Sequence, residues 1–585
     1  MTRLSQLLRD AWWLTRPYFT SEDRWPALAL LAILVGLNLG QVFLSVLFNE
    51  WNNVFYTALQ DKDWATFIHQ MIRFCWLAAL FIIAAVYHLY FNQMLQIRWR
   101  QWLTRRYLDS WLDRRAYYRM QLANGTTDNP DQRIADDLRL FVSQTLGLSL
   151  GLLSAVVTLV SFLGILWALS GSYSVTLFGH AIVIPGYMVW FALGYAVVGT
   201  WLTSKIGHRL VRLNFDQQRY EADFRFSLVR VRENADAIAL DSGEASEKRG
   251  LVQRFVAVAT NWWGIMRAQK RLTWFTAGYN QIAIVFPFAV ASPQYFFGSL
   301  QLGGLMQTAS AFGQVQSSLS FIINAYAELA QWTSVVDRLA QFRTTMATAN
   351  DQAAAAGLDV RRGDDPGIAL EALRIDLPTK EPLLVADKLD LEPHRSVLVT
   401  GPSGTGKSTL FRAIAGIWPF GRGTVRLPAG AKLMFLPQRP YLPVGTLREV
   451  LTYPQAAASI DDGRLREVLR LCDLPDLDGR LDETRHWALS LSPGEQQRLA
   501  FARAFLQRPD WLFVDEATAA LDEATERDLY TKLAKLMPRT TVVSIGHRST
   551  LRDFHADHIA IERKPGETRG HLVRPGLAPA NGVLA

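Results

Sequence analysis

Four long stretches of the chain contain no Asp, Glu, Lys or Arg, and they constrain the fold more than any other feature. A helix that crosses the hydrocarbon core of a bilayer needs about 20 apolar residues. Each of the two shorter stretches therefore predicts one membrane-spanning helix. Each of the two longer ones predicts two helices, joined by hairpins near residues 171–174 and 292–298. The four stretches, which together predict six spans, are residues 25–49, 74–97, 140–204 and 272–327.

The composition favours membrane insertion over a set of buried soluble helices. Of the 585 residues, 19% are charged and 50% are hydrophobic. Buried helices of soluble domains seldom exceed about 20 residues and carry polar residues on one face. The same composition excludes a disordered chain, which would be polar and charged. With two cysteines, Cys75 and Cys472, the chain is not a disulfide scaffold.

Lys and Arg are unevenly distributed among the segments that connect these spans. They gather in the first 24 residues and in residues 98–139 and 205–271, whereas the two hairpins have none. Because cytoplasmic loops carry an excess of positive charge, both termini are expected in the cytoplasm. The two long basic loops are expected to be helices that continue beyond the bilayer. No cleavable signal peptide is expected, because the first apolar run begins late and is too long for one.

A short amphipathic segment precedes the first span. Leu4, Leu7, Leu8 and Trp12 recur at helical spacing. Such a helix either lies on the inner membrane surface with its apolar face in lipid, or packs as an ordinary cytoplasmic helix. The sequence favours the first interpretation and leaves the second open.

The character of the sequence changes after residue 345. Residues 346–367 are rich in Ala, Gly and Asp and predict a linker. From residue 368, short β-rich runs alternate with helical patterns, as at 396–400, 511–514 and 541–545. This alternation predicts an α/β domain with a largely parallel sheet. We therefore expect a transmembrane helical domain over residues 1–345, an α/β P-loop domain over 368–563 and a flexible tail over 564–585.

A phosphate-binding loop opens the α/β domain. The expected strand at 396–400 leads directly into Gly-Pro-Ser-Gly-Thr-Gly-Lys-Ser and then into a helix, which is the context that this motif requires. Backbone N–H groups of such a loop surround phosphate oxygens, and the helix N-terminus adds partial positive charge. Lys407 is expected to reach the β- and γ-phosphates, and Ser408 to ligate Mg²⁺. The residues expected to bind ATP here are Gly401, Pro402, Ser403, Gly404, Thr405, Gly406, Lys407, Ser408 and Thr409.

Two carboxylates end a second buried strand. Residues 511–514 are all apolar and are followed by Asp515 and Glu516. The carboxyl end of a parallel strand faces the phosphates in folds of this type. Asp515 is expected to hold Mg²⁺ through water, and Glu516 to act as the general base on the attacking water.

Residues 491–498, Leu-Ser-Pro-Gly-Glu-Gln-Gln-Arg, resemble the signature motif of ATP-binding cassette (ABC) ATPases. The order of the other motifs also matches that family. Gln438 lies in Leu-Pro-Gln between the phosphate loop and the signature. Residues 520–522, Ala-Leu-Asp, are similar to the D-loop, and His547 in Ile-Gly-His is similar to the switch histidine. A complete set in this order is close to unique to the family, whereas many NTPases share a phosphate loop alone.

The resemblance implies how these residues act. Two ABC domains sandwich two ATP molecules, each between the phosphate loop of one copy and the signature of the other. Ser492, Gly494 and Glu495 are therefore expected to contact ATP held by a partner copy. Gln438 is expected to contact Mg²⁺ and the water, and His547 to hold the γ-phosphate. With Lys407 and Glu516, His547 completes the expected catalytic set, and Ser408, Gln438 and Asp515 are the expected metal ligands.

The sequence departs from the family pattern at two places. Pro493 stands where glycine is usual, and proline removes one backbone N–H. Ser492, Pro493 and Glu495 predict a capping box with proline at the first helical position, so we expect an active site with slower turnover. The aromatic residue that stacks on adenine is expected near residue 377. Residues 374–378 are Arg-Ile-Asp-Leu-Pro, so a flat apolar contact is expected in its place.

One membrane domain and one ATPase domain in a single chain resemble a half-transporter of the exporter type. Because two ATPase domains are needed and the catalytic set is complete, a homodimer is implied. Residues 49–60, 129–134 and 233–247 look like the SbmA/BacA-type and subfamily D branch. Asn129-Pro130 breaks a helix and starts a turn, and a short helix after it is expected to seat in a groove of the ATPase domain. The alternative for this segment is a solvated charged loop.

The branch implies an ATP-driven transporter in the bacterial inner membrane, with a solute in a central cavity and no nucleic acid partner. Its bacterial members are associated with bulky solutes such as cobalamin and proline-rich antimicrobial peptides, and subfamily D members with acyl-CoA. The alternatives are an acyl-CoA or lipid transporter, and an ATP-gated regulator or channel that does not pump. Several uncharged polar residues lie at membrane depth and either line a wet cavity or join helices. They are Asn38, Gln41, Asn280, Gln281, Gln307, Gln314 and Gln316.

Overall fold

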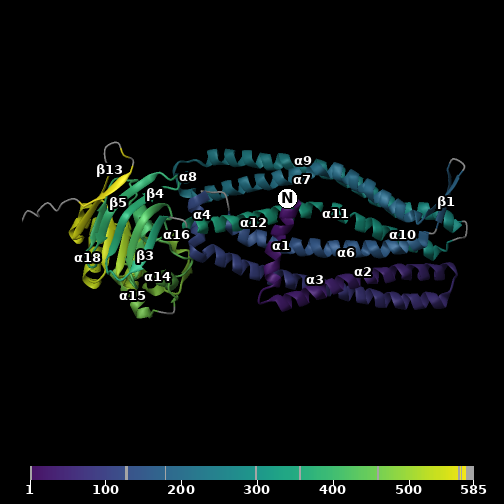
Figure 1. Cartoon of the computed structure of the whole chain (residues 1–585), viewed down its shortest axis with the longest axis horizontal. Helices are drawn as coiled ribbons and strands as arrows, with labels where there is room; N and C mark the ends of the chain where they lie inside the picture. The colour runs from purple at the N-terminus through teal and green to yellow at the C-terminus, as the bar shows by residue number, and fades with distance from the viewer. Residues whose placement is uncertain are drawn as a thin grey trace, which may run out of the picture. The chain divides into compact units, whose positions relative to one another are not determined.

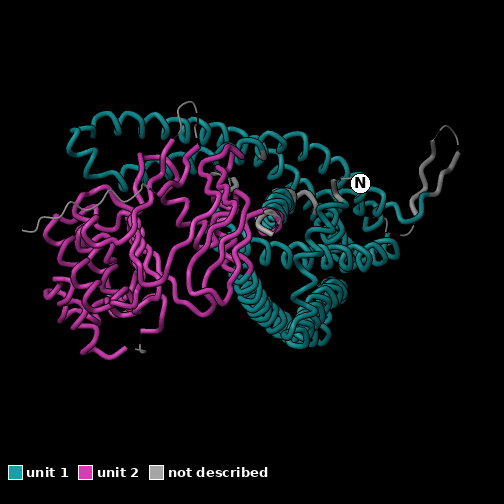
Figure 2. The backbone as a smooth tube through the Cα atoms, turned by 60° about the vertical axis from the view of Figure 1, so that its left-hand side comes forward, with its two compact units in different colours: residues 1–109, 128–343 teal, residues 110–127, 344–585 magenta. Residues whose placement is uncertain are grey.

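The computed structural model describes residues 3–124, 129–170, 172–177, 180–296, 300–354, 357–457, 460–563, 567 and 569–574. The chain forms two compact units, which Figure 2 colours separately. The helical unit comprises residues 1–109 and 128–343. The sheet unit comprises residues 110–127 and 344–585.

Long helices that run alongside one another build the helical unit (Figure 1). Helix α7 packs along α9, and α10 packs against α2, α6 and α9. The helices of this unit and their continuations are α1 (Arg3–Phe19), α2 (Arg24–Gln60), α3 (Trp64–Leu112), α5 (Pro130–Gln132), the π-helical turn η2 (Arg133–Asp137), α6 (Leu138–Ser170), α7 (Tyr187–Glu233), α8 (Ala235–Leu240), α9 (Glu244–Phe296), α10 (Leu302–Leu319), α11 (Phe321–Asn324) and α12 (Tyr326–Ala354).

Among the described residues, three helical segments are long and apolar enough to cross a membrane. They are α2, α3 with its continuation to Leu122, and the segment from Pro130 to Ser170. The other charge-free stretches fall in α7, α9 and α10–α12, where Trp, Tyr, Gly, Ser and Gln are interspersed with the aliphatic residues. Large apolar side chains stay exposed on α2, α3, α6 and α9, as expected where lipid is the solvent. Examples are Phe43, Trp76, Ile82, Val160 and Val285.

The two hairpins differ from the sequence prediction. The first was expected at residues 171–174, but α6 ends at Ser170 and a β-ribbon precedes α7, formed by β1 (Ser172–Leu177) and β2 (His180–Pro185). The connection between α6 and α7 is longer than the predicted turn, because β1 and β2 form this ribbon. Their backbone groups pair with each other and need no helix to do so. The second turn was expected at residues 292–298, but α9 continues to Phe296 and α10 begins at Leu302.

A ten-stranded sheet organises the other unit. Its order is β3-β7-β4-β5-β14-β13-β6-β12-β11-β8, in which β13, β6, β12, β11 and β8 run parallel, and β4 pairs antiparallel with β5 and β7. The strands of this sheet are β3 (Gly357–Gly363), β4 (Ile368–Asp376), β5 (Pro382–Leu391), β6 (Val397–Thr400), β7 (Gly421–Pro428), β8 (Leu433–Leu436), β11 (Trp511–Asp515), β12 (Thr541–Ile545), β13 (Asp557–Arg563) and β14 (Gly570–Val573).

Helices and short turns complete the sheet unit. The short antiparallel pair is β9 (Gly445–Thr446) with β10 (Thr484–Arg485). The helices are η1 (Asp113–Arg115), α4 (Ala116–Asn124), α13 (Lys407–Ile414), α14 (Leu447–Thr452), α15 (Asp462–Leu471), η4 (Pro475–Arg480), α16 (Trp487–Ser490), α17 (Pro493–Gln507), α18 (Glu523–Leu536) and η5 (Ser549–Phe554).

The boundaries of the sheet unit differ from the expected ones. Residues 346–367 were expected to be a linker, but α12 continues to Ala354 and β3 forms a strand beside β7. The tail was expected to be flexible from residue 564, but β14 pairs with β13 and β5; residues 575–585 lie outside the described part. The end of α3 and helix α4 also belong to this unit.

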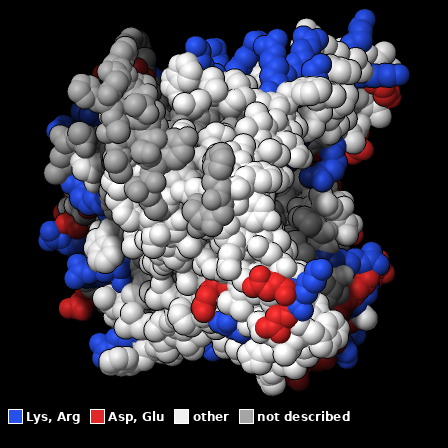
Figure 3. Space-filling model, turned by 90° about the vertical axis from the view of Figure 1, so that its right-hand side faces the viewer, with Lys and Arg blue, Asp and Glu red and all other residues white. Residues whose placement is uncertain are grey.

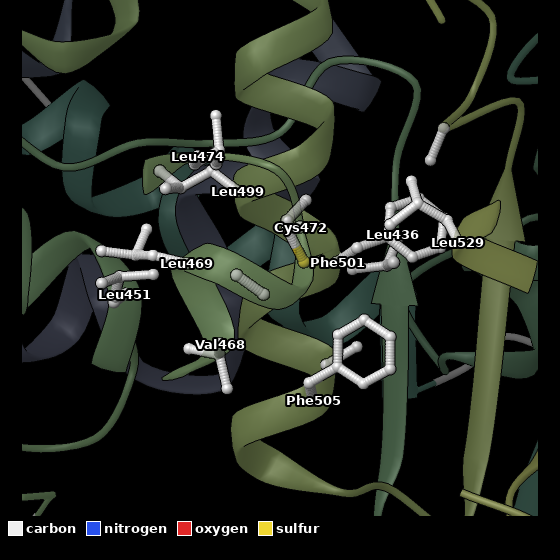
Figure 4. Packing of buried hydrophobic residues seen from close by; sticks show 14 of the residues in the cluster. Leu436, Leu451, Val468, Leu469, Cys472, Leu474, Leu499, Phe501, Phe505 and Leu529 are labelled. Atoms are coloured by element: carbon white, nitrogen blue, oxygen red, sulfur yellow. The ribbon is translucent and has the colours of Figure 1, made fainter. Parts of the chain in front are cut away.

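Among the described residues, apolar cores pack in both units. One core of the sheet unit gathers α14, α15, α17 and α18 around Cys472, as Figure 4 shows. The other lies between α13 and the strands β4–β7 and carries Phe411 and Trp418. In the helical unit, Phe162 and Phe312 join α6, α7, α9 and α10. The face in Figure 3 is mostly uncharged, with charged side chains toward its margins.

Candidate nucleotide site

Four of the predicted motifs follow the carboxyl ends of four adjacent parallel strands. The phosphate loop follows β6, His547 follows β12, Glu516 follows β11 and Gln438 follows β8. The strands are neighbours in the order β6-β12-β11-β8. Since the carboxyl ends of parallel strands meet at one edge, these motifs converge there, where nucleotides bind in α/β folds.

The phosphate loop has the backbone that its glycines permit. Gly404 (φ +72°) and Gly406 (φ +94°) lie in the left-handed region, and Gly406 caps the start of α13. The Nζ of Lys407 donates to the carbonyl oxygens of Gly401 (2.8 Å) and Pro402 (3.0 Å). Thr405 is buried and donates to the Pro402 carbonyl at 2.8 Å. The loop is therefore closed around the lysine, with the N-terminus of α13 beside it.

Ser408 and Asp515 come together although 107 residues separate them. The Ser408 hydroxyl donates to Oδ1 of Asp515 at 2.9 Å. Burial raises the pKa of Asp515, the Ser408 hydrogen bond opposes that rise, and the charge of Glu516 adds to it. A hydroxyl and a carboxylate are hard oxygen donors, so this pair fits the Mg²⁺ site that the sequence predicts.

Glu516 stands at the centre of a second group of predicted residues. Its backbone is left-handed (φ 49°), and its N–H donates to the Ile545 carbonyl at 3.2 Å. Nε2 of Gln438 donates to its Oε2 at 3.3 Å, and Nδ1 of His547 lies 3.7 Å from its Oε1. This left-handed backbone turns the Glu516 carboxylate toward Gln438 and His547. Backbone strain of this kind is typical of functional positions.

The signature segment forms the capping box that the sequence predicts. Ser492 is the N-cap of α17 and Pro493 is its first residue. The Ser492 hydroxyl accepts from the Glu495 N–H (3.3 Å), while the Glu495 carboxylate accepts from the Ser492 N–H (2.8 Å). The Ser492 hydroxyl, which also donates to the Glu495 carboxylate at 2.7 Å, and the Ser492 N–H lower the pKa of Glu495. Among the described residues, no hydrogen bond joins Ser492 or Gly494 to the phosphate loop of the same chain.

Gln497 is a structural residue of the site that the sequence analysis missed. It is buried in α17, its Nε2 donates to the Gln438 carbonyl (3.0 Å), and its Oε1 accepts from the Ala520 N–H (3.0 Å). It thereby links the signature helix to the segments after β8 and β11. Helical spacing with the buried Phe501 and Phe505 was the signal that would have identified this position.

Glu526 is a second missed residue. Its carboxylate is buried and accepts from the hydroxyls of Thr518 (2.5 Å) and Thr550 (2.8 Å). Arg548 lies 3.6 Å from it and donates to the Leu521 carbonyl at 2.8 Å. Glu526 therefore fixes the segments that follow both Glu516 and His547. Nothing in the sequence indicated this role, because Glu526 lies in the first turn of a helix that begins with acidic and polar residues.

The expected adenine region lies where β4 ends. No aromatic residue occurs at 374–378, and Leu377 is half-buried there. The indole of Trp418 donates to the Asp376 carbonyl at 2.9 Å, but Trp418 itself is buried in the core. Leu377 is thus the apolar side chain available for a flat contact.

Two membrane-side motifs form polar contacts within the helical unit. Asp137, at the end of the π-helical turn, is buried and accepts two hydrogen bonds from Arg338 of α12 (2.9 and 2.6 Å) and one from Arg133 (2.8 Å). Near the end of α2, Asn49 donates to the Gln307 carbonyl (3.0 Å), and Asn53 to the Gln307 side chain (2.8 Å). Gln307 thus joins helices, one of the two roles left open by the sequence.

The segments on either side of Asn129 belong to different units. The structure has a three-residue helix, α5, after Asn129 that continues into the helical unit, and the expected seating of this segment on the ATPase domain stays a prediction. Residues 110–127 belong to the sheet unit. There, Arg115 donates to the Ala415 carbonyl at 3.1 Å, and Leu122 packs against the core.

Comparisons with known proteins agree with this geometry. The family model described as ABC transporter transmembrane region 2 matches residues 14–296, and the ABC transporter model matches residues 385–519. A structure titled "Structure of a bacterial Atm1-family ABC exporter with ATP bound" superposes with a TM-score of 0.72 at 17% identity, covering 95% of this chain and 96% of that one. The fold is therefore that of an ABC exporter.

Three relatives indicate which members of the family this chain is similar to. An uncharacterized ABC transporter ATP-binding protein of Synechocystis is 37% identical, covering 92% of this chain and 81% of its own. The inner membrane ABC transporter ATP-binding protein YddA of Escherichia coli is 34% identical, covering 92% and 94%. The human lysosomal cobalamin transporter ABCD4 is 30% identical, covering 79% and 80%.

The fold and the site together define an ATP-hydrolysing membrane transporter of the exporter type. The chain belongs to the ABC transporter family and is a half-transporter similar to subfamily D. ATP binding and hydrolysis follow from this membership, since the ABC domain is the family's ATPase.

Proposed function

We propose that the chain acts as a homodimer in which two copies complete two ATP sites. Within one chain, the signature segment has no hydrogen bond to the described phosphate loop, so it is free to contact ATP on a second copy. The capping box holds Ser492 and Gly494 at the start of α17, where a helix N-terminus attracts phosphate. Large apolar side chains outside the spans, such as Leu240 of α8 (86% exposed), support a second copy as well.

The nucleotide is held by the phosphate loop and by the oxygen donors beside it. Lys407 leaves its loop carbonyls to bind the β- and γ-phosphates, while the loop N–H groups bind phosphate oxygens. Ser408, Asp515 and Gln438 would hold Mg²⁺, which neutralises charge on the phosphates when bound. The contact between Ser408 and Asp515 supports this set, because both oxygens already converge on one point.

Glu516 acts as the general base on the attacking water. Its carboxylate is placed by Gln438 and His547, so the water is oriented by groups that follow three different strands. His547, whose side chain is 74% exposed, turns toward the γ-phosphate and stabilises its charge. Gln497 and Glu526 keep the segments that carry these residues in place.

We further propose that the solute is bulky and hydrophilic or amphiphilic, such as cobalamin or a peptide. This proposal rests mainly on the exposure of Asn280 and Gln281 of α9, which lie inside a charge-free stretch. Exposed amides are unfavourable against lipid, which supports a wet cavity between two copies. Similarity to the transporter named for cobalamin supports the same class of solute.

Acyl-CoA or another lipid is the second candidate. Subfamily D relatives favour it, whereas the lack of Lys and Arg in residues 140–204 and 272–327 does not. The phosphates of CoA need cationic partners, and these stretches supply none. The proposed location is a bacterial inner membrane with both termini in the cytoplasm, supported by the loop charges and by similarity to the inner membrane protein YddA.

Reconstitution in liposomes tests this proposal. ATP hydrolysis is measured together with uptake of labelled cobalamin, a proline-rich peptide and an acyl-CoA. ATP-dependent movement of cobalamin or the peptide, lost in Glu516→Gln, is the expected result, and its sidedness gives the direction. Movement of acyl-CoA alone would replace the first candidate by the second. Hydrolysis without movement of any of them would contradict both.

A further inference from the structure

A small cavity of opposite charges lies where α1, α2 and α3 meet. It has a volume of about 300 Å³. Tyr18 comes from the end of α1, Asp23 and Pro26 from the start of α2, and the remaining residues from one face of α3. The residues that line it are Tyr18, Asp23, Pro26, Arg98, Gln101, Trp102 and Arg105.

The depth of this cavity follows from the charge pattern. The charge-free stretch of α2 begins at Trp25, and that of α3 ends at Ile97. The cavity lies next to both of these limits, so its residues occupy the boundary between hydrocarbon and headgroups on the basic, cytoplasmic side. Trp25 is exposed there with Arg24 over its ring (5.6 Å), an interfacial anchor.

Aromatic packing fixes the wall of the cavity. Tyr18 is buried and stacks on Trp99 with ring centroids 5.7 Å apart, and it also contacts Trp102 at 5.8 Å. These contacts attach the end of α1 to α3. Burial raises the pKa of Tyr18, Asp23 adds to that rise and Arg98 opposes it, so both charges lie close to the phenol ring.

The charged groups of the cavity are not used elsewhere. Among the described residues, the side chains of Asp23, Arg98 and Arg105 make no hydrogen bond or ion pair with another residue. Arg98 and Arg105 are seven residues apart on α3 and therefore share a face of the helix. Two free guanidinium groups at headgroup depth form a phosphate site, and a free carboxylate beside them suits a cation.

We propose that this cavity binds the headgroup of a zwitterionic phospholipid that carries a primary ammonium group. Arg98 and Arg105 bind its phosphate, Asp23 binds its ammonium, and Trp102 and Pro26 contact the glycerol and the first acyl carbons. The presence of both signs distinguishes this ligand from an anionic lipid, for which Asp23 is repulsive. The proposal concerns a site at the protein–lipid boundary and does not depend on the transported solute.

Native mass spectrometry of the full chain in detergent tests the proposal. Phosphatidylethanolamine, phosphatidylcholine and phosphatidylglycerol with identical chains are added in equal amounts, and free phosphoethanolamine is added separately. Phosphatidylethanolamine is expected to bind best. Arg98→Gln with Arg105→Gln should weaken its binding at least about tenfold, because the loss of one charge-assisted hydrogen bond alone accounts for about that factor. Asp23→Asn should abolish the preference over phosphatidylglycerol.

Arg209→Gln serves as the matched control, because Arg209 of α7 is an exposed arginine just beyond another charge-free stretch and lines no part of this cavity. Thermal midpoints and ATP turnover of each variant show that it is folded. Equal binding of phosphatidylglycerol to the unmodified chain would overturn the proposal. So would unchanged binding in the double variant, or free phosphoethanolamine binding as tightly as the lipid, which would make this a site for soluble phosphates.

Discussion

The two units of the chain place their polar side chains in opposite ways. In the sheet unit, polar groups from four strands meet at one edge and bond to one another, as Ser408 does with Asp515 and Gln438 with Glu516. In the helical unit they are spread along the helices. Among the residues described there, the side-chain oxygens of Asn38, Asn49 and Gln70 are buried with no hydrogen-bond partner.

This difference shows what each unit is built for. A site whose groups are already gathered suits one ligand and one reaction, because only side chains such as Lys407 and His547 have to turn when ATP arrives. Buried polar atoms without partners are costly, and native structures keep them where another state or a ligand satisfies them. The helical unit therefore retains hydrogen-bonding capacity that the described residues of the nucleotide site have already used. Elsewhere in the sheet unit, side-chain atoms of Asp478 and Arg503 are also buried without a partner.

The largest effect is expected in the sheet unit. Glu516→Gln removes the general base but keeps the shape of the side chain, so ATP binding should persist while hydrolysis falls at least about 100-fold. Phosphate release and nucleotide binding by the purified chain measure the two steps. Glu523→Gln, an exposed carboxylate at the start of α18, should change neither. Turnover unchanged in Glu516→Gln would refute the assignment.

Asp137, Arg133 and Arg338 form a paired polar cluster in the helical unit, and this cluster should behave like the sheet unit. Asp137→Asn leaves Arg338 and Arg133 without their shared carboxylate, which should cost about 3 kcal/mol of stability. Its neighbour Asp136 is exposed and lies 3.7 Å from Arg139. Asp136→Asn should therefore cost less than about 1 kcal/mol. Equal shifts of the thermal midpoint in the two variants would contradict this account.

Helix α10 allows a matched test of packing. A Cβ on Gly303 would lie 1.9 Å from the Asn53 carbonyl oxygen, whereas a Cβ on Gly313 of the same helix would meet nothing within 4 Å. Gly303→Ala should force α2 and α10 apart at a cost of about 1–3 kcal/mol. Gly313→Ala should stabilise the helix by up to about 1 kcal/mol. Thermal midpoints that move in the same direction would show that the helices do not approach this closely.

The smallest effect is expected at the signature proline. Pro493→Gly and Pro493→Ala both restore a backbone N–H at the start of α17. If that N–H binds phosphate, turnover should rise about threefold, the equivalent of about 0.7 kcal/mol. The two variants control for each other, because only glycine adds backbone freedom. Rates equal to the unmodified chain in both would show that the missing N–H does not limit turnover.

Much of the fold and of the site was predictable from local pattern. The charge-free stretches located the helical unit, and the phosphate loop appears between β6 and α13 as expected. The capping box of Ser492 and Glu495 was also predicted correctly, because it depends on residues within one helical turn. In each case, the physical cause lies within a short length of chain.

The failures concern contacts that no short pattern encodes. Gln497 and Glu526 were missed because their partners lie 8 to 59 residues away and on other elements. Residues 346–367 looked like a linker because Ala and Gly are frequent there, yet pairing with β7 makes residues 357–363 a strand.

By itself, the sequence determined that this chain spans a membrane, binds a nucleotide and belongs with the ABC transporters, because hydropathy and phosphate-loop chemistry are local properties. Only the tertiary structure decided which polar groups meet. It placed Glu516 between Gln438 and His547, paired Asp137 with Arg338 across 201 residues, and brought Asp23 beside Arg98. These contacts between side chains depend on how strands and helices pack, and packing is a property of the whole chain.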